Sequence, residues 1–218
     1  MLTFYYHPLS PIARRVWLAL LEKDIPFEPV IIDPTAKEQF KPEFLQLNPF
    51  HHVPVITQGD FRLVESLAIL DYLEEKYPSP SLSPDTPEER ATMKMVQLVT
   101  ANELLPQLPT LILAEGQVAG ESLATVLRFL NDGLAGRPYY GGEGINLADI
   151  VVGAAVPLCR RLGLSLKPYP ALGAWCDRIT ARPAWQTSSP GDAELEAWRQ
   201  YLQRWIRAKR KRQTRADR

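Results

Sequence analysis

The chain has 218 residues, 45% of them hydrophobic, and its 25 basic and 25 acidic side chains give a formal net charge of zero. This length allows one large domain or two small ones, and no apolar run reaches the roughly 20 residues that a membrane-spanning helix needs. We therefore expect no membrane span, and the first residues, MLTFYYHPLSP, lack the pattern of a signal peptide.

Strands and helices alternate at the start of the chain. Residues 2–6 (LTFYY) read as a strand, residues 11–23 as an amphipathic helix, and residues 27–32 (FEPVII) as a second strand. A strand, a helix and a strand within about thirty residues form a βαβ unit, in which the two strands are parallel.

The rest of this first part predicts a small mixed sheet. A polar, helix-like stretch covers 36–47, the segments PVIT and FRLV flank QGD as a hairpin, and residues 65–77 form a helix. The predicted order is βαβαββα, which is a sheet covered by helices.

A proline-rich segment, PSPSLSPDTP, follows and marks a boundary, because neither a helix nor a strand tolerates this composition. Every later segment has a helical pattern. Thr86 and Pro87 cap the first of these helices, and Pro106 and Pro109 should bend or end it.

The segment INLADIV predicts a well-defined helix start. Asn146 is a good N-cap, Asp149 follows three residues later, and Ile145 can pack against Ile150. We assign this pattern to structure rather than to chemistry, because a buried helix start has backbone donors to satisfy.

The C-terminal end differs from the rest in charge. Residues 199–218 carry nine Lys or Arg and one Asp, which leaves 16 basic and 24 acidic side chains in the body. We expect residues 207–215 to be a solvated helix end that frays into disorder; binding to nucleic acid or to an anionic membrane is the alternative. Trp198, Leu202, Trp205 and Ile206 recur at helical spacing, and we expect them to dock on the protein's own core rather than on a lipid surface.

The cysteines and histidines exclude further classes of site. Cys159 and Cys176 lie 17 residues apart in apolar segments, where cysteine usually packs as a free thiol. Histidine occurs only at positions 7, 51 and 52, and no pair has the spacing of zinc ligands. We therefore expect no disulfide framework, no metal site and a reducing, cytoplasmic location.

Four stretches occur in an order that resembles the cytosolic glutathione transferases. HPLSPIARRVWLALLEK is similar to the first strand-to-helix turn of the serine-type phi and delta classes, NPFHHVPVI to the cis-proline loop, LVESLAILDYL to the Glu-Ser motif, and INLADI to a capping box with Asn146 in place of Ser or Thr. The resemblance extends to about residue 205. It implies an α/β thioredoxin-like domain at 1–78, a linker at 79–87, an all-helical domain at 88–206 and a basic tail at 207–218.

The resemblance gives Val53 and Pro54 a role. Proline has no N–H for a strand ladder, and it makes a cis peptide bond far less costly than other residues do. A cis bond would turn the N–H and C=O of Val53 outward, where the cysteinyl backbone of glutathione could pair with them as an added strand. An ordinary trans proline on an edge strand is the alternative.

Glu65 and Ser66 stand where the last strand meets a helix. A helix N-terminus attracts anions, so Ser66 should meet the γ-glutamyl carboxylate of glutathione, and Glu65 should accept from its ammonium group. The alternative is that these residues only favour the helix start.

Ser10 has two possible roles. Followed by Pro11, it is a good N-cap, worth about 1 kcal/mol. In the serine-type classes a serine at this place donates its hydroxyl to the glutathione sulfur, and the two roles can coexist. Tyr5 and Tyr6 are alternatives, and the absence of cysteine near position 10 argues against the thiol-exchange branch of the family.

The remaining candidates are weaker. His51 and His52 should contact the glycine or cysteine portion of glutathione, and Gln39 and Lys41 its glycine carboxylate; exposed loop polarity is the alternative for all four. The pocket for a hydrophobic electrophile should lie between the 7–12 loop and the proline-bent helix. Its candidate residues are Leu9, Ile12, Leu105 and Leu108.

The sequence therefore predicts a homodimeric, cytoplasmic glutathione transferase. It would activate glutathione, its cosubstrate, as a thiolate for attack on a hydrophobic electrophile, with no further cofactor, no metal and no nucleic acid. A glutathione-dependent peroxidase or isomerase would use the same residues. A non-catalytic scaffold that docks through the basic tail is a further alternative.

Overall fold

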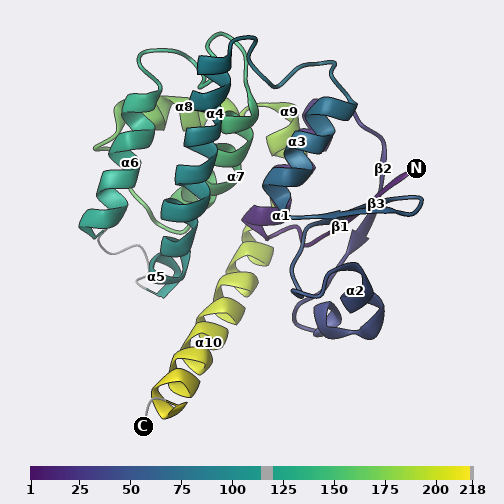
Figure 1. The fold of residues 1–218 in the computed structure, drawn as a ribbon. Coiled ribbons are helices and arrows are strands. Elements are labelled where there is room, and N and C mark those ends of the chain that lie inside the picture. The colour runs from purple at the N-terminus through teal and green to yellow at the C-terminus, as the bar shows by residue number, and fades with distance from the viewer. Residues whose placement is uncertain (114–119, 217–218) are drawn as a thin grey trace.

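The computed structural model describes residues 1–113 and 120–216, and of residues 209–216 it describes the backbone alone. The chain forms two halves, a sheet with its helices and an all-helical half, and the C-terminal helix extends away from both (Figure 1). This arrangement agrees with the predicted thioredoxin-like and helical parts.

Four short strands form the sheet of the first half. They are β1 (Leu2–Tyr6), β2 (Phe27–Ile31), β3 (Val55–Gln58) and β4 (Phe61–Val64), in the spatial order β2-β1-β3-β4. β1 is parallel to β2 and antiparallel to β3, and β3 and β4 form the predicted hairpin. The hairpin turns at Gly59, whose φ of 58° suits glycine.

Three helices accompany the sheet: α1 (Pro11–Glu22), α2 (Pro42–Leu47) and α3 (Ser66–Lys76). The prediction of one helical stretch over 36–47 is wrong, because a 3-10 turn at Glu38–Phe40 is separated from α2. Proline disfavours a helical conformation in the residue before it, and Lys41, which precedes Pro42, is extended with φ −66° and ψ 144°.

The second half contains α4 (Pro87–Val99), α5 (Leu108–Leu113), α6 (Glu121–Gly133), α7 (Leu147–Arg161), α8 (Pro170–Thr180), α9 (Pro183–Thr187) and α10 (Asp192–Ala216). Between α4 and α5 the backbone makes a π-helical turn over Thr100–Leu104 and a 3-10 turn over Leu105–Gln107. Pro106 and Pro109 lack the N–H that a regular helix would use here, so the predicted interruption is confirmed.

The capping box at the start of α7 is also confirmed. Asn146 accepts from the N–H of Ala148 at 2.8 Å, and the Asp149 carboxylate accepts from the N–H of Asn146 at 2.9 Å. Asp149 also accepts from the Tyr140 and Gly141 N–H groups and from the indole of Trp175. Burial raises the pKa of Asp149, and these four donors oppose that rise.

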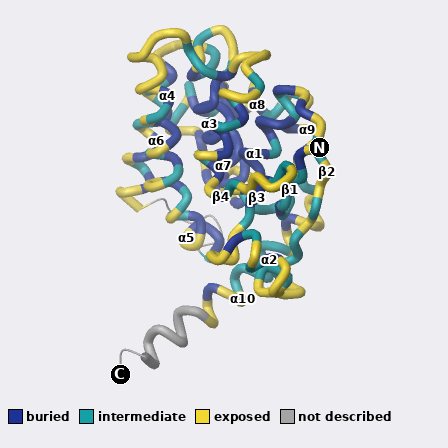
Figure 2. Tube along the Cα trace, turned by 45° about the vertical axis from the view of Figure 1, so that its right-hand side comes forward, coloured by how far each residue is buried: buried dark blue, intermediate teal, exposed yellow. Residues whose placement is uncertain are grey.

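The two halves share one continuous core, which appears as the dark interior of Figure 2. α1 packs against α3 on one side and against α7 and α9 of the helical half on the other. Arg182 forms a two-bond ion pair with Glu22 of α1, at 2.9 and 2.6 Å. α1 is therefore a main link between the two halves, alongside the ion pair between Lys94 of α4 and Asp71 of α3.

α10 remains helical to Ala216, past residue 207, where we predict a separate tail. Its first half docks on the body: the Tyr201 hydroxyl donates to the carbonyl of Pro34, and the Gln203 amide donates to the carbonyl of Ile112. Residues 217–218 lie outside the described residues. No described helix is both long enough and apolar enough to cross a membrane.

Candidate active site

A cavity of about 500 Å³ lies where the first turn of α1, the loop before β3 and the N-terminus of α3 meet α10. Most of the site residues predicted from the sequence line it. They are Ser10, Ile12, Gln39, His51, His52, Val53, Pro54, Glu65 and Ser66.

Ser10 caps α1 and still has a hydroxyl proton to donate. Its Oγ accepts from the N–H of Ala13 at 3.2 Å, and its own N–H donates to the carbonyl of His7. A serine hydroxyl is one donor as well as an acceptor, so the capping bond leaves the donor available to a ligand in the cavity.

The Val53–Pro54 peptide bond is cis. Pro54 is buried and Val53 is partly buried, and the N–H and C=O of Val53 hydrogen bond to none of the described residues. An unpaired donor and acceptor at the rim of a cavity can receive an extended peptide.

Asn48 shapes this loop, and the sequence analysis did not identify it. It is buried, its side-chain amide donates to the carbonyl of His52 at 2.7 Å, and its side-chain oxygen accepts from the N–H of Phe50 at 3.0 Å. Asparagine often makes such local turn bonds, so the Asn-Pro dipeptide at 48–49 was the available signal.

Glu65 and Ser66 differ in environment although they are neighbours. Ser66 is buried and begins α3, whereas Glu65 is exposed and has a φ of 68°. A positive φ is unfavourable for a residue with a side chain, and such strain is often found at functional sites. The conformation places both residues on the cavity wall.

The weaker polar candidates separate into two groups. Gln39 lines the cavity, and its buried Oε1 has no hydrogen-bond partner among the described residues. His51 and His52 also line it and are exposed. Lys41 does not line this cavity; it is exposed and pairs with Glu38 at 2.9 Å.

The apolar wall differs from the prediction. Ile12 lines the cavity, but Leu9, Leu105 and Leu108 do not. Leu108 is buried in the core, and Leu9 and Leu105 pack against the core. The π-helical and 3-10 turns redirect the chain at 100–107, so that helical spacing could not show which way these leucines face.

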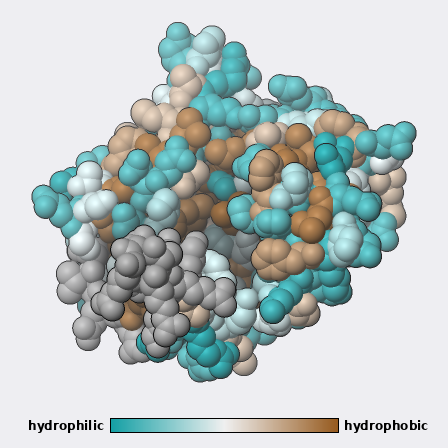
Figure 3. Space-filling model, turned by 60° about the horizontal axis from the view of Figure 1, so that its bottom comes forward, coloured by the Kyte–Doolittle hydropathy of each residue, from teal (hydrophilic) through white to brown (hydrophobic). Residues whose placement is uncertain are grey.

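α10 provides this wall through Trp198, Leu202 and Trp205. Ile206 is buried in the core, and Trp198 and Leu202 pack against it, as their spacing in the sequence predicts. The same prediction is wrong for Trp205, which is 50% exposed, because it lies on the side of α10 that faces away from the core. Figure 3 shows hydrophobic side chains around a hollow between the two halves, on the face from which α10 extends.

Tyr5 and Tyr6 do not line this cavity. The ring of Tyr6 stacks on Phe4 at 4.7 Å, and burial raises the pKa of its hydroxyl. His7 and Arg15, which the sequence analysis did not select, do line it. Burial lowers the pKa of His7, so its imidazole is more readily neutral than in water.

The comparisons with known proteins agree with this geometry. Residues 4–81 match the family model for the glutathione S-transferase N-terminal domain, and residues 104–178 match that for the C-terminal domain. Glutathione S-transferase F10 of Arabidopsis thaliana is 33% identical over 211 residues, which are 87% of this chain and 97% of the relative. The chain belongs to the cytosolic glutathione S-transferase family.

Two further relatives of the transferase are informative. Maleylacetoacetate isomerase of Rattus norvegicus is 30% identical over 197 residues, 85% of this chain and 91% of the relative. The solved structure of glutathione transferase E6 from Drosophila melanogaster superposes with a TM-score of 0.79 at 26% identity, covering 93% of this chain and 98% of that one. The family fold is thus shared over almost the whole chain.

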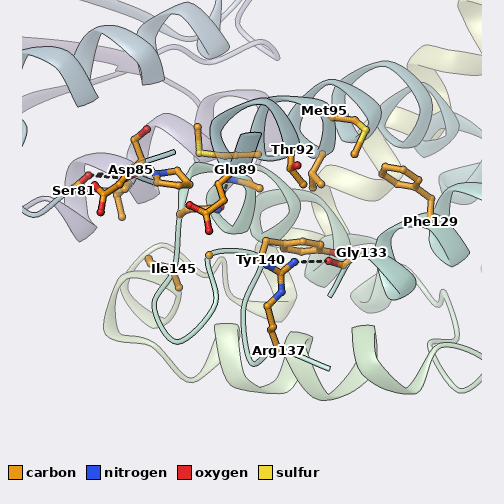
Figure 4. Close-up of a pocket in the computed structure, with 18 of the residues that line it drawn as sticks. Ser81, Asp85, Glu89, Thr92, Met95, Phe129, Gly133, Arg137, Tyr140 and Ile145 are labelled. Atoms are coloured by element: carbon orange, nitrogen blue, oxygen red, sulfur yellow. Dashed lines mark hydrogen bonds between the residues drawn. The ribbon is translucent and has the colours of Figure 1, made fainter. Parts of the chain in front are cut away.

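The transferase also has a larger cavity, of about 610 Å³, which lies between α4, α6 and the segment before α7. Asp85 and Glu89 lie toward one side of this cavity, Met95 and Phe129 toward another, and Arg137 donates to the carbonyl of Gly133 (Figure 4). None of the predicted site residues lines it. We therefore take the smaller of these two cavities as the candidate active site.

The cysteines of the transferase lie outside both cavities. Cys159 and Cys176 are buried free thiols, and burial raises the pKa of Cys159 to about 12. The described residues contain no cluster of His, Cys, Asp or Glu that could hold a metal ion.

Proposed function

We propose that this chain binds glutathione in the smaller cavity, activates it as a thiolate, and transfers it to a hydrophobic electrophile. One observation carries the proposal. The Ser10 hydroxyl, the open Val53 backbone, the N-terminus of α3 and an apolar wall converge on a single cavity.

The polar groups of the cavity match the parts of glutathione. The cysteinyl backbone pairs with the N–H and C=O of Val53, and the γ-glutamyl carboxylate accepts from the N–H and hydroxyl of Ser66 at the helix N-terminus. The Glu65 carboxylate accepts from the γ-glutamyl ammonium group. His51, His52 and Gln39 also line the cavity and would contact the glycine end.

Ser10 acts on the sulfur. A free thiol has a pKa near 8.5, so only a few per cent is ionised at neutral pH. A hydroxyl that donates to the sulfur favours the thiolate, and so does the positive end of α1. The thiolate then attacks the electrophilic carbon; a carbon–sulfur bond forms, and the electron pair moves onto the leaving group or onto the acceptor's conjugated oxygen.

The electrophile lies against Ile12, Trp198, Leu202 and Trp205. Indole rings present large flat apolar surfaces that stack well on aromatic compounds. We therefore propose aromatic or other planar hydrophobic electrophiles as the substrate class. A homodimer and a cytoplasmic location, which are typical of the family, are further parts of this proposal.

An isomerase is the second candidate, because the rat relative is named maleylacetoacetate isomerase. A thiolate that adds to a carbon–carbon double bond allows rotation about it and can then leave again, so the residues that would activate glutathione for conjugation would also serve an isomerisation. A glutathione-dependent peroxidase is the remaining alternative from the sequence. Assays of conjugation, of cis–trans isomerisation of a maleyl group, and of hydroperoxide reduction distinguish the transferase, the isomerase and the peroxidase.

Calorimetry with glutathione at millimolar concentration tests the site. We expect binding by the wild-type protein, and a loss of affinity on the order of tenfold in Ser66→Ala, since a hydrogen bond to a charged group is worth about 1.5–3 kcal/mol. Ser165→Ala, an exposed loop serine, is the control. Failure of the wild-type protein to bind glutathione would overturn the proposal in favour of a scaffold.

A further inference from the structure

Two consecutive arginines of α1 are buried, but their surroundings differ. Arg14 is 7% exposed and Arg15 is 5% exposed. Arg14 reaches the helical half: its Nε donates to the Ser188 hydroxyl at 3.2 Å, and its Nη2 donates to the carbonyl of Trp185 at 3.4 Å. Arg14 therefore has protein acceptors and serves the contact between the two halves.

Arg15 faces the active-site cavity instead. Its Nε makes one long hydrogen bond, of 3.4 Å, to the carbonyl of Ile12. Its Nη1 is buried and has no hydrogen-bond partner among the described residues, and the side chain lines the cavity. Burial lowers the pKa of Arg15 to about 10, so the guanidinium remains charged at neutral pH.

An unpaired N–H on a buried cation is unfavourable, because it has lost water without gaining an acceptor. A helical side chain points back toward the N-terminus of its helix, and the bond to the Ile12 carbonyl shows that Arg15 does so. Its guanidinium thus lies beside the first turn of α1, which Ser10 caps. The cavity that it faces is the place from which an acceptor can come.

Glu65 does not supply the hydrogen-bond acceptor that Nη1 of Arg15 lacks. The two charges attract each other, but they do not form one of the ion pairs present among the described residues. Glu65 is moreover exposed, and its carboxylate remains available to the ammonium group of a ligand.

We propose that Nη1 of Arg15 donates a hydrogen bond to a negatively charged atom of the glutathione bound in this cavity. This inference rests on the proposed function. Glutathione carries three anions, and in the proposed orientation two of them would lie near Arg15. These are the thiolate beside Ser10, which caps the same helix, and the γ-glutamyl carboxylate beside Ser66, the neighbour of Glu65. Both would give Arg15 the acceptor that it lacks.

Arg15→Gln and Arg15→Lys test the inference, with Arg14→Gln as the matched control on the same helix. Two quantities are measured for each protein: the dissociation constant for glutathione by calorimetry, and the pKa of the bound thiol from the ultraviolet absorbance of the thiolate. We expect Arg15→Gln either to raise the dissociation constant for glutathione on the order of tenfold or to raise the pKa of the bound thiol by about one unit. In Arg14→Gln both should stay within about twofold, while the midpoint of thermal unfolding falls.

The two anions give different results. If Arg15 donates to the thiolate, its loss raises the pKa of the bound thiol. If it donates to the carboxylate, its loss weakens binding and leaves that pKa unchanged. Arg15→Lys keeps the positive charge but not the planar guanidinium group with its several N–H donors. The affinity or thiol pKa of this variant should therefore lie between those of the wild type and Arg15→Gln. It also provides the measurement if Arg15→Gln does not fold.

Wild-type affinity and an unchanged thiol pKa in a folded Arg15 variant would overturn the inference and leave the proposed function intact. Absence of glutathione binding by the wild-type protein would overturn both.

Discussion

Ser10 has a structural role as the N-cap of α1 and a proposed chemical role toward the glutathione sulfur, and comparison with a second N-cap residue can separate the two. Thr86 caps α4 as Ser10 caps α1: each side-chain oxygen accepts from the N–H three residues later at 3.2 Å. Thr86, however, does not line the active-site cavity. The pair therefore offers two similar N-caps, of which only Ser10 lines the proposed glutathione site.

We predict that Ser10→Ala and Thr86→Ala each lower the free energy of unfolding by about 1 kcal/mol, as the loss of an N-cap does. Only Ser10→Ala should also lower kcat and shift the pH–rate profile to higher pH, because the thiol then ionises at a higher pH. Denaturant unfolding and pH-dependent conjugation rates measure the two effects. An unchanged pH profile in Ser10→Ala would remove Ser10 from the mechanism.

Residues whose place on the cavity wall follows from a local pattern could be predicted from the sequence. Ser10 precedes a proline at a helix start, and Glu65 and Ser66 stand at a strand-to-helix junction. Arg15 was missed, because two consecutive arginines look alike in a sequence. Only the packing of α9 against α1 shows that Arg14 points to the helical half and Arg15 to the cavity.

Among the elements, α10 combines two functions along its length. Its first part provides Trp198, Leu202 and Trp205 to the cavity, and Tyr201 and Gln203 attach it to the body. The basic residues that give the C-terminal end its charge lie mostly beyond residue 206. Substrate binding should therefore depend on the first part of α10 and not on its end.

We predict that deletion of residues 207–218 leaves kcat and both KM values within about twofold of wild type. Leu202→Ala should raise the KM for a hydrophobic electrophile several-fold, since removing apolar contact area costs about 25 cal/mol per Å², and leave the KM for glutathione unchanged. Steady-state kinetics with each substrate varied in turn measure this. Leu98→Ala, on an exposed face of α4, is the control.

A large loss of activity on deletion of 207–218 would show that the basic end belongs to the site. An equal rise of both KM values in Leu202→Ala would show that the residue supports the fold and not the electrophile.

Elements were predictable where their signals are local. The capping box of α7 and the hairpin of β3 and β4 depend on residues within a few positions of each other, and the structure has both. The prediction of one helix over 36–47 was wrong, because the residue before Pro42 is extended. The prediction that Leu105 and Leu108 line the pocket was also wrong, because both follow a π-helical turn. Such a turn shifts the face of a helix, and periodicity alone does not reveal it.

For the whole molecule, the order of the two halves could be predicted but their contact could not. The contact combines the packing of α1 on α7 and α9 with an ion pair between Glu22 of α1 and Arg182, which are 160 positions apart in the sequence. The Glu22 side chain is 10% exposed and that of Arg182 is 31% exposed, so water screens this pair less than the exposed pair between Arg160 and Asp177.

We predict that the two halves unfold in one transition, because the buried side chains of both belong to one core. In a Trp17→Phe variant the remaining tryptophans, Trp175, Trp185, Trp198 and Trp205, all belong to the helical half and α10, so their fluorescence reports on that part of the chain. Far-ultraviolet circular dichroism reports on the whole chain, so coincident denaturation curves would show a single transition. Arg182→Ala should lower the free energy of unfolding by about 1–3 kcal/mol, since it leaves a largely buried carboxylate without its partner. Arg160→Ala, within the helical half, should change it by less than about 1 kcal/mol. Separate transitions for the two probes, or equal effects of the two substitutions, would contradict a structure in which α1 joins the sheet to the helices.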